Sequence, residues 1–142
     1  MAPVRQFQVT FDCADPERVA RFWCEVLGYV VPPPPEGFAD WDAFDGTLPP
    51  EEQGSAFACV DPTGVGPRLF FQRVPEGKVV KNRVHLDLTT TADDRDAEIE
   101  RLIGLGARRV DVGQTEQDSW DVLADPEGNE FCVVRPKTSL VA

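Results

Sequence analysis

The stretch QVTFDCADPER, residues 8–18, decides the fold because HLDLTTTADDR, residues 85–95, repeats its pattern. Each stretch begins with alternating apolar residues, passes through a short polar turn and enters an amphipathic segment. This is the order of a strand followed by a helix. The offset between the two stretches is 77 residues. Such internal similarity predicts a domain built from two related halves.

A second repeat shows where the halves differ in length. DPTG at residues 61–64 matches DPEG at residues 125–128 with an offset of 64, and an apolar run follows each. Both tetrapeptides are typical of tight turns. Since the two offsets are 77 and 64, the first half carries about 13 additional residues. The proline-rich segment 32–50 is the expected place for them.

One helix is expected in each half. Asp15 is a suitable N-cap, Pro16 suits the first helical position, and Gly28 can end the helix in a left-handed conformation. Between them an apolar stripe at helical spacing predicts a buried face: Val19, Ala20, Phe22, Trp23, Val26 and Leu27. The second helix is expected to begin with a pair that resembles a capping box, Thr91 with Asp94. Its apolar stripe is Ile99, Leu102 and Ile103, and it is expected to end at Gly104 or Gly106.

The strands predicted around these helices make each half a βαβββ module. They cover residues 7–13, 29–31, 55–60 and 68–74 in the first half, and 84–89, 108–112, 120–124 and 130–135 in the second. The predicted fold class is therefore α+β, with modules at about 5–75 and 83–136 and a linker at about 75–82. We expect one domain over residues 1–142, in which a curved, half-open, eight-stranded mixed sheet carries helices on its outer face. Its concave face would suit a small molecule.

Composition excludes several classes of partner. The chain has 25 acidic against 14 basic residues, a formal charge of −11. Nucleic-acid binding draws on clustered Lys and Arg, so no nucleic-acid partner is expected, nor docking to an anionic membrane. No apolar run reaches the length of a membrane span or a signal peptide, and a cytoplasmic location is expected. Cys13, Cys24, Cys59 and Cys132 are widely spaced and are expected to be reduced, mostly buried thiols.

Four motifs resemble the vicinal oxygen chelate superfamily, and more narrowly its glyoxalase-like domain group. They are DCADP at 12–16, FWCEVLGY at 22–29, VHLDL at 84–88 and DPEGNEF at 125–131. The superfamily includes glyoxalase I, extradiol dioxygenases, and bleomycin- and fosfomycin-resistance proteins. The resemblance implies the paired-module fold and a homodimer. The resemblance says less about activity, because the superfamily contains both metalloenzymes and proteins that bind ligands without a metal.

The resemblance also implies where a metal would bind. Metal-binding members place four side chains in the concave cleft, one from the first and one from the last strand of each half. Carried over, these positions fall on Gln8, Gln72, His85 and Cys132. The two last-strand positions lack the usual carboxylate, although Glu130 shares a strand face with Cys132 and could supply one. A histidine and a thiolate would suit Zn²⁺, and the resemblance also allows Ni²⁺, Co²⁺ or Mn²⁺.

Other side chains have two interpretations each. His85 is either a functional group, as metal ligand or acid/base catalyst with Glu130, or a hydrogen-bonded histidine lining the cleft. Asp87 shares its strand face and could orient it. Phe38, Trp41 and Phe44 recur every three residues, which suggests a helical turn whose rings either cover the sheet end or form a cleft lid or dimer contact. Trp120 either lines the cleft or packs beneath it.

Two functions therefore remain open from the sequence. The first is a protein that binds a small organic molecule in the cleft without a full metal site. The alternative is a divalent-metal-dependent lyase or isomerase of glyoxalase type, in which the ion polarises substrate oxygens. An extradiol dioxygenase is disfavoured because the chain holds a single histidine. The sequence names no ligand.

Overall fold

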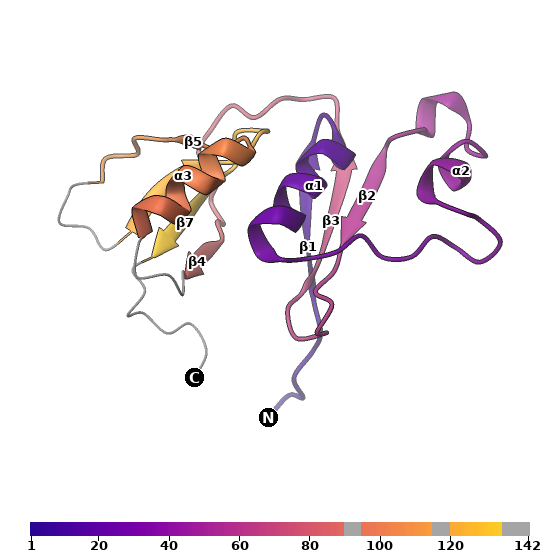
Figure 1. The fold of residues 1–142 in the computed structure, drawn as a ribbon, viewed down its shortest axis with the longest axis horizontal. Helices are drawn as coiled ribbons and strands as arrows, with labels where there is room; N and C mark the ends of the chain where they lie inside the picture. The colour runs from indigo at the N-terminus through magenta and orange to yellow at the C-terminus, as the bar shows by residue number, and fades with distance from the viewer. Residues whose placement is uncertain (90–94, 115–119, 135–142) are drawn as a thin grey trace. The chain divides into compact units, whose positions relative to one another are not determined.

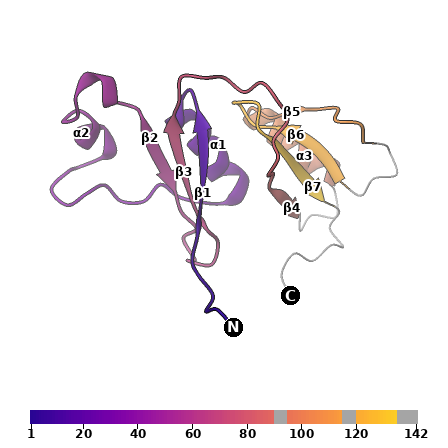
Figure 2. The ribbon, with the colours of Figure 1, turned by 180° about the vertical axis from the view of Figure 1, so that it is seen from behind.

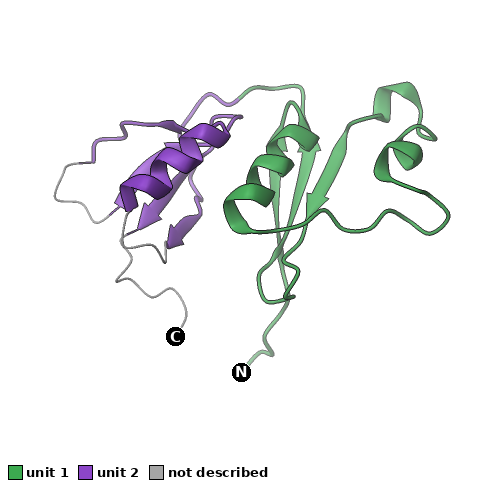
Figure 3. Cartoon of the chain, viewed as in Figure 1, with its two compact units in different colours: residues 1–77 green, residues 78–142 purple. Residues whose placement is uncertain are grey.

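The structure is a computed structural model that describes residues 1–89, 95–114 and 120–134. It divides into two compact units, unit 1 (Met1–Gly77) and unit 2 (Lys78–Ala142) (Figure 3). Unit 1 holds β1 (Gln8–Cys13), α1 (Pro16–Leu27), α2 (Trp41–Asp45), a 3₁₀ turn (Pro50–Glu52), β2 (Ala56–Cys59) and β3 (Arg68–Arg73). Unit 2 holds β4 (Asp87–Thr89), α3 (Arg95–Leu105), β5 (Arg108–Arg109), β6 (Trp120–Ala124) and β7 (Glu130–Val134).

The α+β class is confirmed, with one mixed sheet in each unit. Unit 1 has the strand order β1-β3-β2 and unit 2 the order β4-β7-β6-β5. In both, the first strand runs parallel to the last strand and the last runs antiparallel to its other neighbour. The described residues form seven strands rather than the predicted eight, because segment 29–31 makes only an isolated bridge, Val30 with Val60. A single curved sheet made from both halves stays a prediction.

Helix α1 begins and ends as its sequence predicts. The Asp15 carboxylate accepts the Arg18 backbone N–H at 3.3 Å, and Gly28 has φ 72°. In Figure 1 α1 lies in front of the unit 1 sheet, and in Figure 2 behind it. Trp23 packs on Phe11 at 5.5 Å between ring centroids, and Phe11 stacks on Phe71 at 5.0 Å. The core of unit 1 therefore lies between this face of the sheet and α1.

Helix α3 covers one face of the unit 2 sheet in the same way (Figures 1 and 2). Arg95, its first residue, pairs with Asp121 of β6 at 3.1 Å, which places the helix on the face that Asp121 and Leu123 share. Ile99 and Leu102 of the predicted stripe are buried. The helix ends at Leu105, before Gly106 with φ 123°. The expected capping residues, 91 and 94, lie outside the described residues.

Both predicted turns form around a carboxylate. Asp61 accepts the backbone N–H groups of Thr63 and Gly66, each at 2.7 Å. The fully buried Asp125 accepts those of Glu127 and Asn129, each at 2.9 Å. A buried carboxylate held by backbone donors is stable because hydrogen bonds replace its lost hydration. Each turn leads the chain into the last strand of its unit.

Candidate functional site

The face of each sheet that points away from its helix carries the candidate functional residues. In unit 1, alternation places Phe11, Leu69 and Phe71 toward α1, so their strand neighbours project from the opposite face. These neighbours are Gln8, Thr10 and Asp12 on β1, Arg68, Phe70 and Gln72 on β3, and Ala56 and Ala58 on β2. The sheet thus presents a mixed apolar and polar surface on the side that the helix leaves uncovered.

A cavity of about 270 Å³ lies over this surface of unit 1. The sheet contributes Ala56, Phe57, Ala58, Arg68 and Phe70, helix α1 contributes Glu17, and the long loop contributes Trp41, Phe44 and Leu48 among others. Ligand pockets are mostly apolar with a few polar groups, and most have volumes of about 300–1,000 Å³. The cavity therefore matches a small ligand in composition and is close to the lower end of that range in size.

The loop over the cavity is held in shape by its own hydrogen bonds. The Trp41 indole N–H donates to the Pro32 carbonyl at 2.7 Å, and the Asp40 carboxylate caps α2 by accepting the Ala43 N–H at 2.8 Å. Arg73 of β3 donates to the carbonyls of Gln53 at 2.9 Å and Glu51 at 2.7 Å. The Arg73 contacts tie the C-terminal part of the loop to the sheet, and the other two contacts hold the loop on itself, so the cavity is largely pre-formed.

The predicted helical turn in this loop is confirmed as α2. Phe44 lies edge-on to both Trp41 and Phe38, at centroid distances of 5.9 Å and 5.3 Å. The rings pack on one another, as the sequence interpretation of a small additional core requires. Trp41 and Phe44 also line the cavity, as the lid interpretation requires. Phe38 packs on Phe44 without lining the cavity.

Gln8 and Gln72 lie at opposite ends of the β1–β3 pair. Gln8 is opposite Arg68, whereas Gln72 is opposite Asp12, four positions further along. At about 3.3 Å per residue, the two positions are separated by ~13 Å along the strands. The Gln8 side-chain oxygen accepts from Arg68 at 3.3 Å, and the Gln72 amide donates to Asp12 at 2.8 Å. This spacing is too long for both amides to bind one ion.

In unit 2, His85, Asp87 and Cys132 come together. His85 Nδ1 lies 2.9 Å from Asp87 Oδ1 and 4.0 Å from Cys132 Sγ. Asp87 is directly opposite Cys132 in the β4–β7 pair, and the ligand atoms of all three residues lie within 4.8 Å of one another. His85 itself precedes β4, which begins at Asp87, three residues after the predicted start of this strand at residue 84. His85 and Asp87 are exposed and Cys132 is buried.

The donors of this cluster, one imidazole, one carboxylate and one thiol, suit Zn²⁺ and leave a fourth position open. Burial, and then the charge of Asp87, raise the pKa of the Cys132 thiol to about 11. At neutral pH the thiol is therefore protonated, and a metal ion would have to displace that proton. The residues fit a three-ligand metal site, but the thiol proton lowers its affinity.

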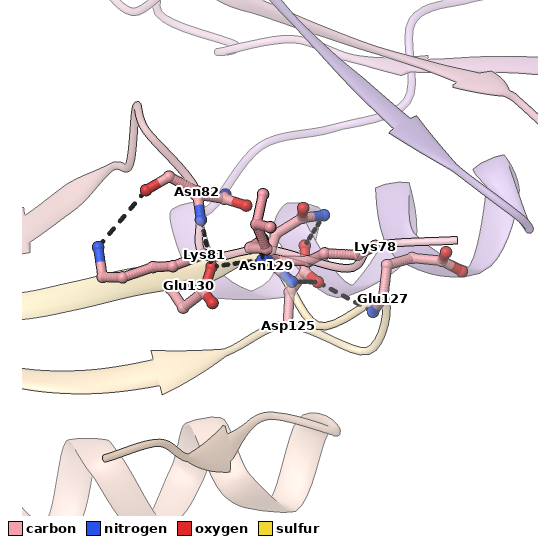
Figure 4. Close-up of polar contacts among 8 residues, drawn as sticks. Lys78, Lys81, Asn82, Asp125, Glu127, Asn129 and Glu130 are labelled. Carbon is pink, nitrogen blue, oxygen red and sulfur yellow. Dashed lines mark hydrogen bonds and ion pairs between the residues drawn. The ribbon is translucent and has the colours of Figure 1, made fainter. Parts of the chain in front are cut away.

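Glu130 is engaged elsewhere in unit 2 (Figure 4). Its carboxylate lies 3.0 Å from Lys78 Nζ and accepts the Asn82 backbone N–H at 3.0 Å. Burial opposes ionisation, yet these two contacts outweigh it and lower the pKa of Glu130 below its usual value. The carboxylate is thus an ionised partner of segment 78–82 and is not part of the His85 cluster.

Trp120 begins β6 opposite Val134, and its side chain is on the face that carries Val122 and Cys132. This is the face away from α3. Its exposed fraction is 40%, so its ring is not part of the core. That the ring lines a cleft stays a prediction.

Strand register also shows which unit 1 residue corresponds to Cys132. Asp87 repeats Thr10 at the offset of 77, and the structure places Phe70 opposite Thr10, as it places Cys132 opposite Asp87. The sequence alignment on phenylalanines paired Cys132 with Gln72 instead. Phe70 follows Asp61 by nine residues and Cys132 follows Asp125 by seven, a difference of two, whereas the alignment on phenylalanines assumed a difference of four. Phe70 was missed for this reason.

Comparison with solved structures identifies the class of fold. A glyoxalase/bleomycin resistance protein/dioxygenase family enzyme from Burkholderia phytofirmans has a TM-score of 0.59 and 15% identity, covering 90% of this chain and 95% of its own. The fosfomycin resistance protein FosX from Listeria monocytogenes, solved with Mn(II), has a TM-score of 0.62 and 9% identity, covering 96% and 93%. TnmS3, an antibiotic binding protein from a Streptomyces species, has a TM-score of 0.55 and 23% identity, covering 96% and 99%.

The fold is thus that of the vicinal oxygen chelate superfamily, as the sequence motifs predicted. The family model described as a glyoxalase-like domain matches residues 8–134, and the chain belongs to that family. No curated protein matches it. None of the helices in the described residues is long and apolar enough to cross a membrane.

Proposed function

We propose that this protein binds a small organic molecule in the unit 1 cavity and does so without a complete metal site. The observation that carries the proposal is the cavity itself, which lies between the uncovered sheet face and the aromatic loop. The loop is fixed by Trp41 and Arg73 before any ligand arrives. The antibiotic binding protein of the same fold supports such a role by analogy.

The additional loop of the first half is the second support. Segment 32–55 carries α2 and the 3₁₀ turn, whereas the described part of unit 2 has no helix between α3 and β6. A rigid loop that one half has and the other lacks is typical of a binding element placed on a duplicated scaffold. In this proposal the sheet and the loop each contribute residues to the lining of the binding site.

The proposal is tested by a thermal-shift screen of small organic molecules. Ligands of the cavity are expected to raise the Tm of the wild type but not that of Ala56→Leu, because the larger side chain fills the cavity that Ala56 lines. Ala43→Leu is the matched control, since Ala43 is exposed and does not line the cavity. Ligands whose Tm shift is unchanged in Ala56→Leu would place binding elsewhere and contradict the proposal.

The second candidate function is a divalent-metal-dependent lyase or isomerase of glyoxalase type. The observation that favours it is the cluster of His85, Asp87 and Cys132, and FosX of the same fold was solved with Mn(II). When bound, an ion would polarise adjacent substrate oxygens. Asp87 would orient His85 through their hydrogen bond.

Metal analysis separates the two candidates. We expect less than stoichiometric metal in protein purified without chelators, and after loading with Zn²⁺, Ni²⁺, Co²⁺ or Mn²⁺, since three donors converge among the described residues and one of them is a protonated thiol. Stoichiometric metal that is lost in His85→Ala would overturn the metal-free proposal and support the enzyme. Asp96→Asn in the exposed first turn of α3 is the control. A homodimer, expected from the family resemblance, is to be tested by sedimentation.

A further inference from the structure

The lining of the unit 1 cavity includes the exposed guanidinium group of Arg68, which has no carboxylate partner among the described residues. Arg68 is the single basic residue among those lining the cavity. It donates to the Gln8 amide oxygen at 3.3 Å and lies over the Phe70 ring at 5.6 Å from the centroid. Across the described residues, no carboxylate oxygen lies within the 4.0 Å of an ion pair with Arg68. Most of its five N–H donors are therefore available to a ligand.

This absence stands out because acidic residues are abundant nearby. Glu17, Asp42 and Asp45 line the same cavity, and none pairs with Arg68. The Glu17 carboxylate pairs with Arg21 at 3.3 Å, and both Asp45 oxygens accept the Gly54 N–H, at 2.9 and 3.1 Å. Two of the three carboxylates in the lining thus have other partners. Arg68 forms no ion pair with any of the three.

The walls beside Arg68 are aromatic. Phe70 rises from the sheet next to the guanidinium, and Trp41 and Phe44 project from the loop. Aromatic rings favour offset-stacked or edge-to-face contact with another ring. The planar guanidinium can bind two oxygens of one oxyanion at once, a geometry that a carboxylate matches. Rings and guanidinium together define a site for a flat molecule with an acidic group at one end.

We propose that the ligand of this cavity is a planar aromatic acid, with its ring between Phe70 and the loop rings Trp41 and Phe44 and its carboxylate on Arg68. This inference rests on the proposed function, since it names the ligand class of the same cavity. The volume of about 270 Å³ limits the ligand to one or two fused rings with a short acidic substituent. The carboxylates in the lining then oppose a second acidic group on the ligand.

Three probes of one shape test the assignment by isothermal titration calorimetry. They are 2-naphthoate, the neutral 2-naphthamide and the cationic 2-naphthylmethylammonium. We expect 2-naphthoate to bind about tenfold more tightly than 2-naphthamide, because a charge-assisted bidentate contact replaces a neutral one. We expect the ammonium probe to bind most weakly, since it meets Arg68.

Variants assign the preference to Arg68. Arg68→Gln is expected to remove the difference between 2-naphthoate and 2-naphthamide while retaining 2-naphthamide binding. Arg18→Gln makes the same charge change at an exposed position of α1 that does not line the cavity, and it should retain the difference. Circular dichroism of both variants confirms that each is folded.

The inference and the proposed function fail in different ways. Equal binding of 2-naphthoate and 2-naphthamide, or tightest binding of the ammonium probe, overturns the acid assignment and leaves small-molecule binding intact. Binding of none of the three probes also overturns the assignment. The proposed function is overturned separately, when no molecule of the thermal-shift screen depends on the cavity that Ala56→Leu fills.

Discussion

Asp87 and Cys132 lie directly opposite each other on β4 and β7, and the corresponding pair in unit 1 is Thr10 opposite Phe70. The same two backbone positions therefore carry a carboxylate and a thiol in one unit, and a hydroxyl and an aromatic ring in the other. In unit 2 they complete a cluster of metal-binding groups with His85. In unit 1 Phe70 lines an apolar cavity. The two units thus share their strand register at this position and differ in the side chains that it carries.

The Asp87–Cys132 pair has a measurable consequence for the thiol. Burial is the largest cause of the raised Cys132 pKa, and the negative charge of Asp87 adds to it. Removing that charge in Asp87→Asn should lower the thiol pKa from about 11 by up to about one unit, because burial remains. The rate of Cys132 alkylation by iodoacetamide, followed by peptide mass spectrometry from pH 7 to 10, should rise accordingly. Asp96→Asn should leave the rate unchanged, and equal rates in all three proteins would show that Asp87 does not act on the thiol.

Glu130 should make the stability of the protein depend on pH. Its folded pKa is lowered by Asn82 and Lys78 despite burial, so its contribution is present above the ordinary glutamate pKa, about 4.3, and is lost as pH falls through the folded value. Glu130→Gln should therefore lower the free energy of unfolding by about 1 kcal/mol at pH 7, with a difference that narrows below about pH 4. Urea unfolding at pH 7, 5 and 3 measures this.

The exposed Glu76 provides the control for that series. Glu76→Gln also removes one negative charge, but from a carboxylate that has no partner in the segment 78–82. It should alter the free energy of unfolding by less than about 0.5 kcal/mol at every pH. A loss in Glu130→Gln that persists undiminished at pH 3 would indicate that packing, and not the ion pair with Lys78, accounts for its effect.

Local signals in the sequence predicted the elements well. The Asp15 cap, the Gly28 terminus and the turns at Asp61 and Asp125 depend on residues close in sequence, and each forms as expected. The prediction of a full strand at 29–31 was wrong. Its hydrogen bonding depends on a partner far along the chain, and in this segment Val30 alone forms a bridge, with Val60. Propensity does not determine such long-range pairing.

The candidate site was harder to predict for the same reason. His85 and Asp87 share a sequence motif, so their proximity could be inferred from alternation. The partner of Asp87 across the sheet and the role of Arg68 depend on the register of β3 and β7. That register follows from the length of a turn, and no local pattern reports it. The offset of the two turn motifs does not give it either, because an offset of 64 carried to the last strands matches Cys132 with Arg68, whereas the structure matches it with Phe70.

Gly66 is the position where that longer turn tolerates no side chain. A Cβ at Gly66 would overlap the Tyr29 hydroxyl, which donates to the Pro67 carbonyl at 3.0 Å, and would lie 3.2 Å from Asp61 Oδ2. Gly66→Ala should therefore destabilise unit 1 by about 1–3 kcal/mol, because Tyr29 must move and its hydrogen bond is lost. Gly77→Ala, where a Cβ meets nothing within 4 Å, should change the free energy of unfolding by less than about 0.5 kcal/mol. In a Tyr29→Phe background the cost of Gly66→Ala should fall, since the overlapping oxygen is gone. A double-mutant cycle by urea unfolding measures the coupling, and additive losses would show that the clash with Tyr29 is not the cause.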